Sequence, residues 1–240
     1  NKMIPKIIHY CWFGGKPLPE DAKKYIESWE KYCPDYKICR WDESTFDINE
    51  IPYVKEAYEA KKWAFITDYV RLYVLKNIGG IYMDTDVEVI KNLDCFLNEK
   101  GFSGFEKIDA VPTGIMAAEK NHPFITELLH DYDNLHFLKD DGTLDLTTNV
   151  VRITNIAKKY GLKLNNEKQT INGFTFYPKE FFCPKSSRTL EIKLTNNTYT
   201  IHHFAGSWNT ENKLRILVKK TLPVWMLKCI VKIMDELGIK

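Results

Sequence analysis

The residues from Gly79 to Val87 read GGIYMDTDV and place two aspartates two positions apart at the end of an apolar, β-prone segment. Residues i and i+2 of a strand project to the same face, so Asp84 and Asp86 are expected to converge on one point. Two oxygen ligands at one point suit Mg²⁺ or Mn²⁺, and such an ion commonly also binds substrate phosphates. Because Asp-x-Asp is also common in solvated loops, its context decides its meaning.

The segment before these aspartates predicts a buried helix with a polar stripe. Steps of four, three and four residues place Ala64, Asp68, Arg71 and Leu75 on one side of a helix over residues 62–76. An exposed Asp68–Arg71 pair would contribute only about 0.5 kcal/mol. The helix is instead apolar around most of its circumference, which predicts burial, and buried charges need partners or a function. Its polar stripe is expected to open onto the same cleft as the aspartates.

Periodicity and chain breakers predict an alternation of strands and helices ahead of the aspartates. Strands are expected over residues 4–13 and 35–41, and helices over residues 20–33 and 53–77. This order is typical of an α/β fold with parallel strands. Further along, the pattern predicts helices over residues 123–137 and 147–160, a turn at residues 140–142 and strands within residues 170–204.

Three segments together resemble the sugar-binding region of the family-32 glycosyltransferases. The first is Ile4-Pro5-Lys6-Ile7-Ile8-His9-x2-Trp12-x-Gly14, the second is Ala64-x3-Asp68-x2-Arg71 followed by Gly79-Gly80-Ile81-Tyr82-x-Asp84-x-Asp86, and the third is His202-His203-Phe204-Ala205-Gly206-Ser207-Trp208. That family includes yeast-type mannosyltransferases and bacterial capsule or O-antigen transferases, and the large clostridial glucosylating toxins are similar in motif. Three motifs in the right order are more specific than any one alone.

The resemblance implies a GT-A fold, a Rossmann-like mixed sheet flanked by helices, together with a nucleotide-sugar donor, Mn²⁺ or Mg²⁺, and retention of anomeric configuration. Asp86 would ligate the metal directly, and Asp84 would contact the metal and the ribose. A histidine would complete the metal site, and the His-x-x-Gly form favours His203 over His202. Neighbouring strand residues face opposite ways, so only one of the two is expected to serve. Either histidine could equally be a hydrogen-bonded core residue.

The resemblance also implies the contacts of the donor. Asp68 and Arg71 would hold the hydroxyls of the sugar, Trp12 would lie against the base or ribose, and Ser207 and Trp208 would touch the pyrophosphate.

Glycosyl transfer must stabilise a leaving pyrophosphate, which a metal does as a Lewis acid. The expected catalytic residues are therefore Asp68, Arg71, Asp84 and Asp86. The acceptor site stays open, because residues 147–150 read Thr-Thr-Asn-Val where the family has a Gly-Pro turn.

The last 28 residues differ in charge from the rest of the chain. Residues 213–240 carry seven basic and two acidic residues, whereas residues 1–212 carry 27 basic and 30 acidic ones. We therefore expect a catalytic domain over residues 1–212 and a basic appendage over residues 213–240. A helix over residues 223–234 combines Trp225 and other apolar residues with lysines, as in helices that lie in a membrane surface. Packing against the body or against a second subunit would explain the same pattern.

The resemblance thus implies a metal-dependent retaining transferase. It would move a hexose from a nucleotide-sugar, UDP-linked rather than GDP-linked, to a glycan acceptor, lipid-linked, in surface polysaccharide biosynthesis. No nucleic-acid partner is expected. The absence of a signal-peptide pattern and of C-x-x-C pairs predicts a cytoplasmic protein. The basic C-terminal helix predicts that it lies peripherally at the inner membrane face. The alternatives are a phosphatase of the haloacid dehalogenase type, with the first aspartate as nucleophile, and a non-catalytic nucleotide- or carbohydrate-binding module.

Overall fold

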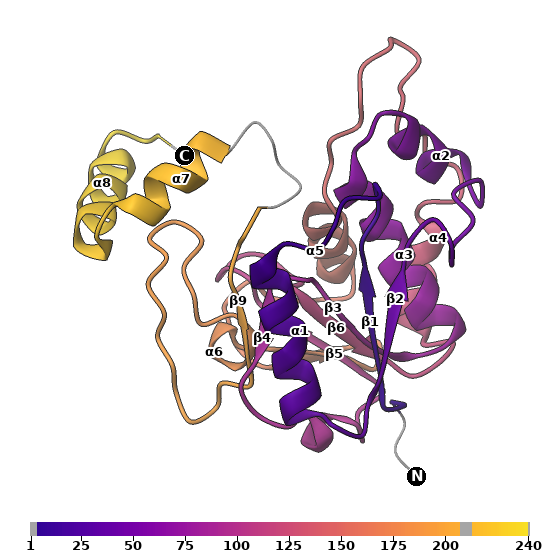
Figure 1. The fold of residues 1–240 in the computed structure, drawn as a ribbon, viewed down its shortest axis with the longest axis horizontal. Coiled ribbons are helices and arrows are strands. Elements are labelled where there is room, and N and C mark those ends of the chain that lie inside the picture. The colour runs from indigo at the N-terminus through magenta and orange to yellow at the C-terminus, as the bar shows by residue number, and fades with distance from the viewer. Residues whose placement is uncertain (1–3, 207–212, 240) are drawn as a thin grey trace.

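A seven-stranded mixed sheet forms the centre of the molecule (Figure 1). The computed structural model describes residues 4–206 and 213–239. The strand order is β2-β1-β3-β6-β5-β8-β7, with β1 (Ile7–Cys11), β2 (Lys37–Trp41), β3 (Gly80–Met83), β5 (Gly101–Gly104), β6 (Ile115–Ala118), β7 (Gln169–Ile171) and β8 (Phe174–Tyr177). Strand β1 is parallel to β2 and β3, β6 is antiparallel to β3 and β5, and β8 is parallel to β5 but antiparallel to β7. The mixed sheet is confirmed, and its parallel part is confined to β2-β1-β3 and β5-β8.

Helices cover both faces of this sheet. The predicted helices ahead of the aspartates are confirmed as α1 (Glu20–Tyr32), α2 (Pro52–Glu59) and α3 (Trp63–Asn77). The two helices predicted later in the chain are α4 (Pro123–His130) and α5 (Asn149–Lys159). The structure adds a short helix, α6 (Lys179–Phe182), and a 3₁₀ turn over Asp94–Phe96. Tyr82 belongs to the core under α3, whereas Ile81 and Met83 belong to the core under α1, as the two-residue period of a strand requires.

Helix α3 leads into β3 through two glycines. Gly79 has φ of 79°, a conformation that favours glycine and ends the helix. Gly80 has φ of 119°, and a Cβ there would lie 2.7 Å from the carbonyl oxygen of Ile7. The close approach of α3, β1 and β3 therefore depends on this pair.

Two predicted segments are less regular than expected. The helix predicted over residues 123–137 ends at His130, and residues 131–134 form turns, since the amide of Asp133 bonds the carbonyl of His130 at 3.1 Å. Residues 170–204 contain β7, β8 and β9 (Thr200–His202), but residues 184–198 form a long loop with one isolated bridge between Lys185 and Ile192. We call residues 184–198 the β9 loop.

A small second sheet joins the third sequence motif to the aspartates. Strand β4 (Val87–Val89) pairs antiparallel with β9, and Val87 lies opposite His202. Two segments more than a hundred residues apart thereby meet at the end of β3.

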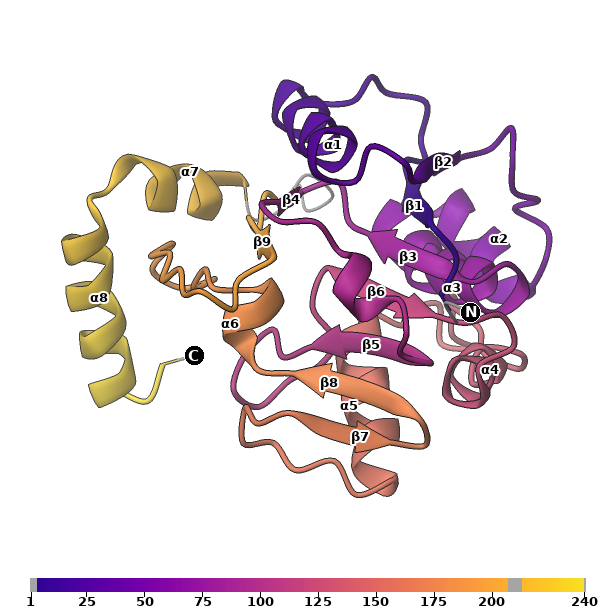
Figure 2. The same ribbon diagram turned by 90° about the horizontal axis from the view of Figure 1, so that it is seen from below.

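The C-terminal helices α7 (Lys213–Thr221) and α8 (Val224–Glu236) lie against the β9 loop (Figure 2). Arg188 pairs with Asp235 at 2.9 Å, and Lys228 pairs with Glu191 at 2.7 Å. The Lys219 ammonium donates to the carbonyl of Ser187 at 2.7 Å. The predicted helix is confirmed, with Pro223 as the N-cap of α8 instead of its first helical residue.

Candidate functional site

Asp84 and Asp86 lie in a turn between β3 and β4. The amide of Asp84 donates to the carbonyl of Gly114 at 2.8 Å, and the amide of Val87 donates to the carbonyl of Asp84 at 3.0 Å. Ligand atoms of Asp84, Asp86 and His202 all lie within 4.8 Å of one another. The convergence of the two carboxylates is confirmed, but it comes from this turn and not from the pleat of one strand.

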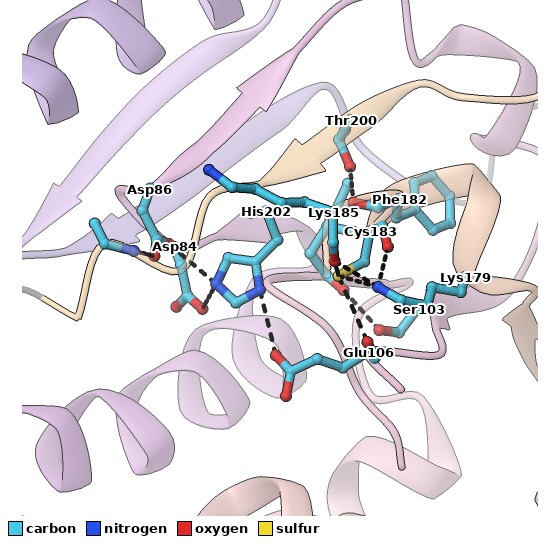
Figure 3. Close-up of polar contacts among 12 residues, drawn as sticks. Asp84, Asp86, Ser103, Glu106, Lys179, Phe182, Cys183, Lys185, Thr200 and His202 are labelled. Atoms are coloured by element: carbon cyan, nitrogen blue, oxygen red, sulfur yellow. Dashed lines mark hydrogen bonds and ion pairs between the residues drawn. The ribbon is translucent and has the colours of Figure 1, made fainter. Parts of the chain in front are cut away.

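His202 faces the two carboxylates from β9 (Figure 3). Its Nε2 atom lies 3.2 Å from Asp86 Oδ1 and 4.0 Å from Asp84 Oδ2, and its Nδ1 atom lies 3.2 Å from Glu106 Oε1. Burial opposes the imidazolium, but Asp86 and Glu106 raise the pKa of His202 above its usual value. Gly114 provides the space, since a Cβ there would lie 3.1 Å from the imidazole.

His203 faces away from this cluster. Its Nε2 atom lies 2.7 Å from Glu88 Oε2, and its ring stacks on Tyr25 with centroids 4.6 Å apart. The prediction that His203 rather than His202 completes the metal site is therefore wrong. The pairing of β4 with β9 turns His202 toward the carboxylates. His203 contributes through its backbone, because its amide donates to the carbonyl of Asp86 at 2.9 Å.

The two aspartates have opposite electrostatics. Burial raises the pKa of Asp84, although Arg71 opposes the shift. Burial also acts on Asp86, but His202 and the amide of Ala205, which donates to Asp86 Oδ2 at 2.9 Å, outweigh it and lower the pKa of Asp86. Asp86 is thus the more strongly held anion of the pair.

The polar stripe of α3 does open onto the aspartates. Arg71 and Asp68 are each 6% exposed. Arg71 Nη2 lies 3.1 Å from Asp84 Oδ1 and 3.5 Å from Asp68 Oδ1, and the guanidinium lies 4.6 Å from the centroid of the Tyr82 ring. The Tyr82 hydroxyl donates to Asp84 Oδ1 at 3.0 Å. Arg71 therefore links the helix to the Asp-x-Asp turn, and the predicted burial of the stripe is confirmed.

Asp68 also joins α3 to α5. Its Oδ2 atom accepts the backbone N–H of Asn149 at 3.1 Å, at the first turn of α5. Burial raises the pKa of Asp68 to about 6, against the opposing effects of Arg71 and Asn149. Because the folded-state pKa exceeds the unfolded one, ionised Asp68 costs stability at neutral pH, and the cost is relieved as the pH falls through about 6.

Two residues at this site, Glu106 and Asn149, lie outside the three sequence motifs. Glu106 lies in an irregular segment after β5 and meets His202 only through the fold. Asn149 falls within the segment left open as the acceptor region; it is buried, and its side-chain nitrogen has no hydrogen-bond partner among the described residues. An asparagine at the start of a predicted helix was the one available signal, and it also fits an ordinary cap.

The expected nucleotide contacts lie at the edge of the described structure. Trp12 follows β1, is half-buried, and its indole N–H donates to the carbonyl of Lys16 at 2.6 Å. Its predicted stacking on the base or ribose stays a prediction. Ser207 and Trp208 lie outside the described residues.

Comparisons with known proteins find similarity to glycosyltransferases. Residues 19–103 match the family described as glycosyltransferase sugar-binding region containing DXD motif. An uncharacterized glycosyltransferase of Acanthamoeba polyphaga mimivirus is 28% identical over 220 residues, covering 88% of this chain and 77% of that protein. Inositol phosphoceramide mannosyltransferase 3 of Schizosaccharomyces pombe is 30% identical over 142 residues, covering 56% of this chain and 38% of that protein.

A solved structure shares the fold. It is a glycosyltransferase involved in the glycosylation of the major capsid of PBCV-1, with a TM-score of 0.50 and 12% identity over 90% of this chain and 100% of that chain.

Proposed function

We propose that this chain, which has a GT-A fold and matches the DXD sugar-binding region of glycosyltransferases, is a metal-dependent, retaining hexosyltransferase. Its donor would be a nucleoside diphosphate sugar, and its acceptor a lipid-linked glycan. The observation that carries the proposal is the cluster of Asp84, Asp86 and His202, which arises from two distant segments and lies next to Arg71. A phosphatase of the haloacid dehalogenase type is not supported by the family match, and a binding module would not need the intact cluster.

The cluster suits a divalent metal. Two carboxylates and one imidazole within 4.8 Å are ligands that Mn²⁺ accepts, and Mg²⁺ suits the carboxylates. The bound metal would act as a Lewis acid on the diphosphate. Glu106, whose Oε1 lies 3.2 Å from Nδ1 of His202 without hydrogen-bond geometry, would hold the ring through its charge. The amide of Ala205 would fix Asp86 through its hydrogen bond.

The donor sugar would lie beside Asp68 and Arg71. Asp68 accepts hydroxyl hydrogen bonds best when ionised, and Arg71 holds it beside Asp84 in the free enzyme. Asn149 offers an unpaired amide at the same place, which supports a polar ligand there. We name no enzyme nucleophile for the retaining reaction.

The names of the relatives suggest which donor and acceptor classes this chain uses. The matched protein of Schizosaccharomyces pombe is named for mannosyl transfer to inositol phosphoceramide, which supports a hexose donor and a lipid-borne acceptor. For this chain we propose a UDP-sugar over a GDP-sugar and a role in surface or capsular polysaccharide synthesis, because its motifs also resemble those of bacterial capsule and O-antigen transferases.

A donor screen tests this proposal. We expect one UDP- or GDP-hexose, and Mn²⁺ with it, to raise the melting temperature and to be hydrolysed slowly without acceptor, because ligands of the folded state stabilise it. The control is p-nitrophenyl phosphate, on which a phosphatase would act. Hydrolysis of that ester alone, or stabilisation by every sugar without metal, would contradict the proposal.

We also propose that α8 binds an anionic membrane surface. Apolar side chains on this helix face solvent, among them Trp225 at 66% and Leu237 at 67% exposure, and basic residues outnumber acidic ones by seven to two over residues 213–240. Among the described helices, none has the length and hydropathy that a span across the bilayer would need. Apolar exposure beside lysines fits a helix lying in the plane of an anionic leaflet, where a lipid-linked acceptor would also be.

Vesicle flotation tests the membrane proposal. The double variant Trp225→Ser with Ile233→Ser is expected to bind vesicles containing phosphatidylserine about 10-fold more weakly than the unmodified chain, because it removes two exposed apolar side chains. The matched control is Ile108→Ser, which is 66% exposed on the body of the protein. Equal flotation of all three proteins, or flotation of none, would refute the role of α8.

A further inference from the structure

Lys185 brings a positive charge to the acidic cluster from the β9 loop. Its side chain is half-buried and, in the view of Figure 3, extends toward Asp86, whose charge acts on its ammonium. Its Nζ atom lies 3.2 Å from Nδ1 of His203. Among the described residues, that is its side chain's one hydrogen-bond partner, and no carboxylate oxygen lies within 4.0 Å of it.

The imidazole of His203 is a neutral acceptor for this ammonium. Its Nε2 atom lies 2.7 Å from Glu88 Oε2, so the proton belongs on Nε2 and Nδ1 accepts from Lys185. Two of the three N–H groups of the Lys185 ammonium are therefore available to another partner. Because this ammonium is half-buried and its one partner is neutral, an anion beside it would be stabilised.

The backbone of Lys185 is held in place, so the position of the ammonium is not that of a free loop. The carbonyl of Lys185 accepts from Lys179 Nζ at 2.6 Å, and the same Nζ donates to the carbonyl of Cys183 at 2.5 Å. The bridge to Ile192 fixes the other side of the loop. The backbone of Lys185, near the start of the β9 loop, is thus held against α6.

The cations of the site divide between the two aspartates. Arg71 lies against Asp84 and Asp68, where it is committed to their carboxylates. Lys185 approaches from the Asp86 side, and burial together with Lys220 lowers its pKa while Asp86 and Glu88 oppose that shift. An anion that binds between the Asp86 side of the cluster and His203 would therefore meet Lys185 and not Arg71.

We infer that Lys185 binds the diphosphate of the donor and stabilises it as the leaving group. The inference rests on the proposed function. In the transfer, the bond between the anomeric carbon and the phosphate oxygen breaks, and its electron pair goes to that oxygen. The acceptor hydroxyl bonds to the anomeric carbon and passes its proton to the same oxygen. Lys185 takes no part in the covalent step; its charge offsets the negative charge that develops on the diphosphate.

Product binding by the full chain tests this inference. Lys185→Gln is expected to bind UDP with Mn²⁺, and GDP with Mn²⁺, about 10- to 100-fold more weakly, because one charge-assisted hydrogen bond is lost. The corresponding nucleoside should bind as before, and kcat with the best donor should fall by at least about 10-fold. Lys185→Arg should recover part of both losses. The matched control is Lys193→Gln, a 78%-exposed lysine of the same loop.

The outcomes separate this inference from the proposed function. Mn²⁺ binding without nucleotide, measured by electron paramagnetic resonance, should be the same in Lys185→Gln as in the unmodified chain, whereas loss of the metal site would affect it directly. Unchanged diphosphate affinity in Lys185→Gln would overturn the inference. Equal losses for the nucleoside and its diphosphate would overturn it too, since they would indicate a disturbed pocket and not a missing charge.

Discussion

Asp86→Ala is expected to lower hexosyl transfer by on the order of 10³-fold, since a metal contributes several kcal/mol to stabilising a leaving group. Asp86 has the lowered pKa of the aspartate pair, lies 3.2 Å from His202 Nε2 and receives the amide of Ala205. Its removal would take away the ligand best held as an anion. The measurement is initial rate with the best donor, together with Mn²⁺ binding by electron paramagnetic resonance.

The controls for Asp86→Ala separate charge from shape. Asp86→Asn keeps the size of the side chain and should lose nearly as much activity, because the amide oxygen is a weaker metal ligand. Asp140→Asn changes an exposed aspartate of a distant turn and should leave both readouts unchanged. Full Mn²⁺ binding and full turnover by Asp86→Ala would rule out the metal site.

Arg71→Met is expected to lower the free energy of unfolding by about 3–5 kcal/mol at pH 7.5, because removing one partner leaves buried charge uncompensated. Arg71 lies 3.1 Å from Asp84 and 3.5 Å from Asp68, both of which would lose their nearest cation. The loss should be smaller at pH 5.5. Without Arg71 the raised carboxyl pKa values rise further, so protonation relieves the folded state as the pH falls.

Urea unfolding at both pH values measures this loss. The control is Arg40→Met, which removes an exposed pair with Asp42 and should cost less than about 1 kcal/mol. A loss for Arg71→Met as small as that of the control would show that Asp68 and Asp84 do not depend on the guanidinium. Growth of the loss toward low pH would contradict the assigned direction of the pKa shifts.

Much of the first half of the chain follows from local sequence. The apolar circumference of residues 62–76 indicates a buried helix, and the two glycines that follow end it, so α3 and β3 are predictable one after the other. The convergence of Asp84 and Asp86 was also predictable, although its cause was not. A strand and a tight turn both bring residues i and i+2 together, and nothing local distinguishes them here.

The rest depended on contacts between distant segments. Which of His202 and His203 faces the carboxylates is set by the register of β4 with β9, where Val87 lies opposite His202. A slip by one residue would exchange the two histidines, and no local pattern fixes that register. Glu106 and Lys185 belong to irregular segments, so only the folded chain brings them to the site. The antiparallel pairing of β6 with β3 likewise depends on the course of the chain between these two strands, which no local pattern predicts.

The ion pairs between the C-terminal helices and the β9 loop make truncation an unsuitable experiment. Deleting α8 would remove the partners of Arg188 and Glu191, three and six residues along the chain from Lys185. If a truncated protein lost activity, the loss could come from a less ordered β9 loop or from a missing membrane contact, and the activity assay would not separate the two. Point substitutions at Trp225 leave both pairs intact, so recruitment and turnover can be scored separately in the same molecule.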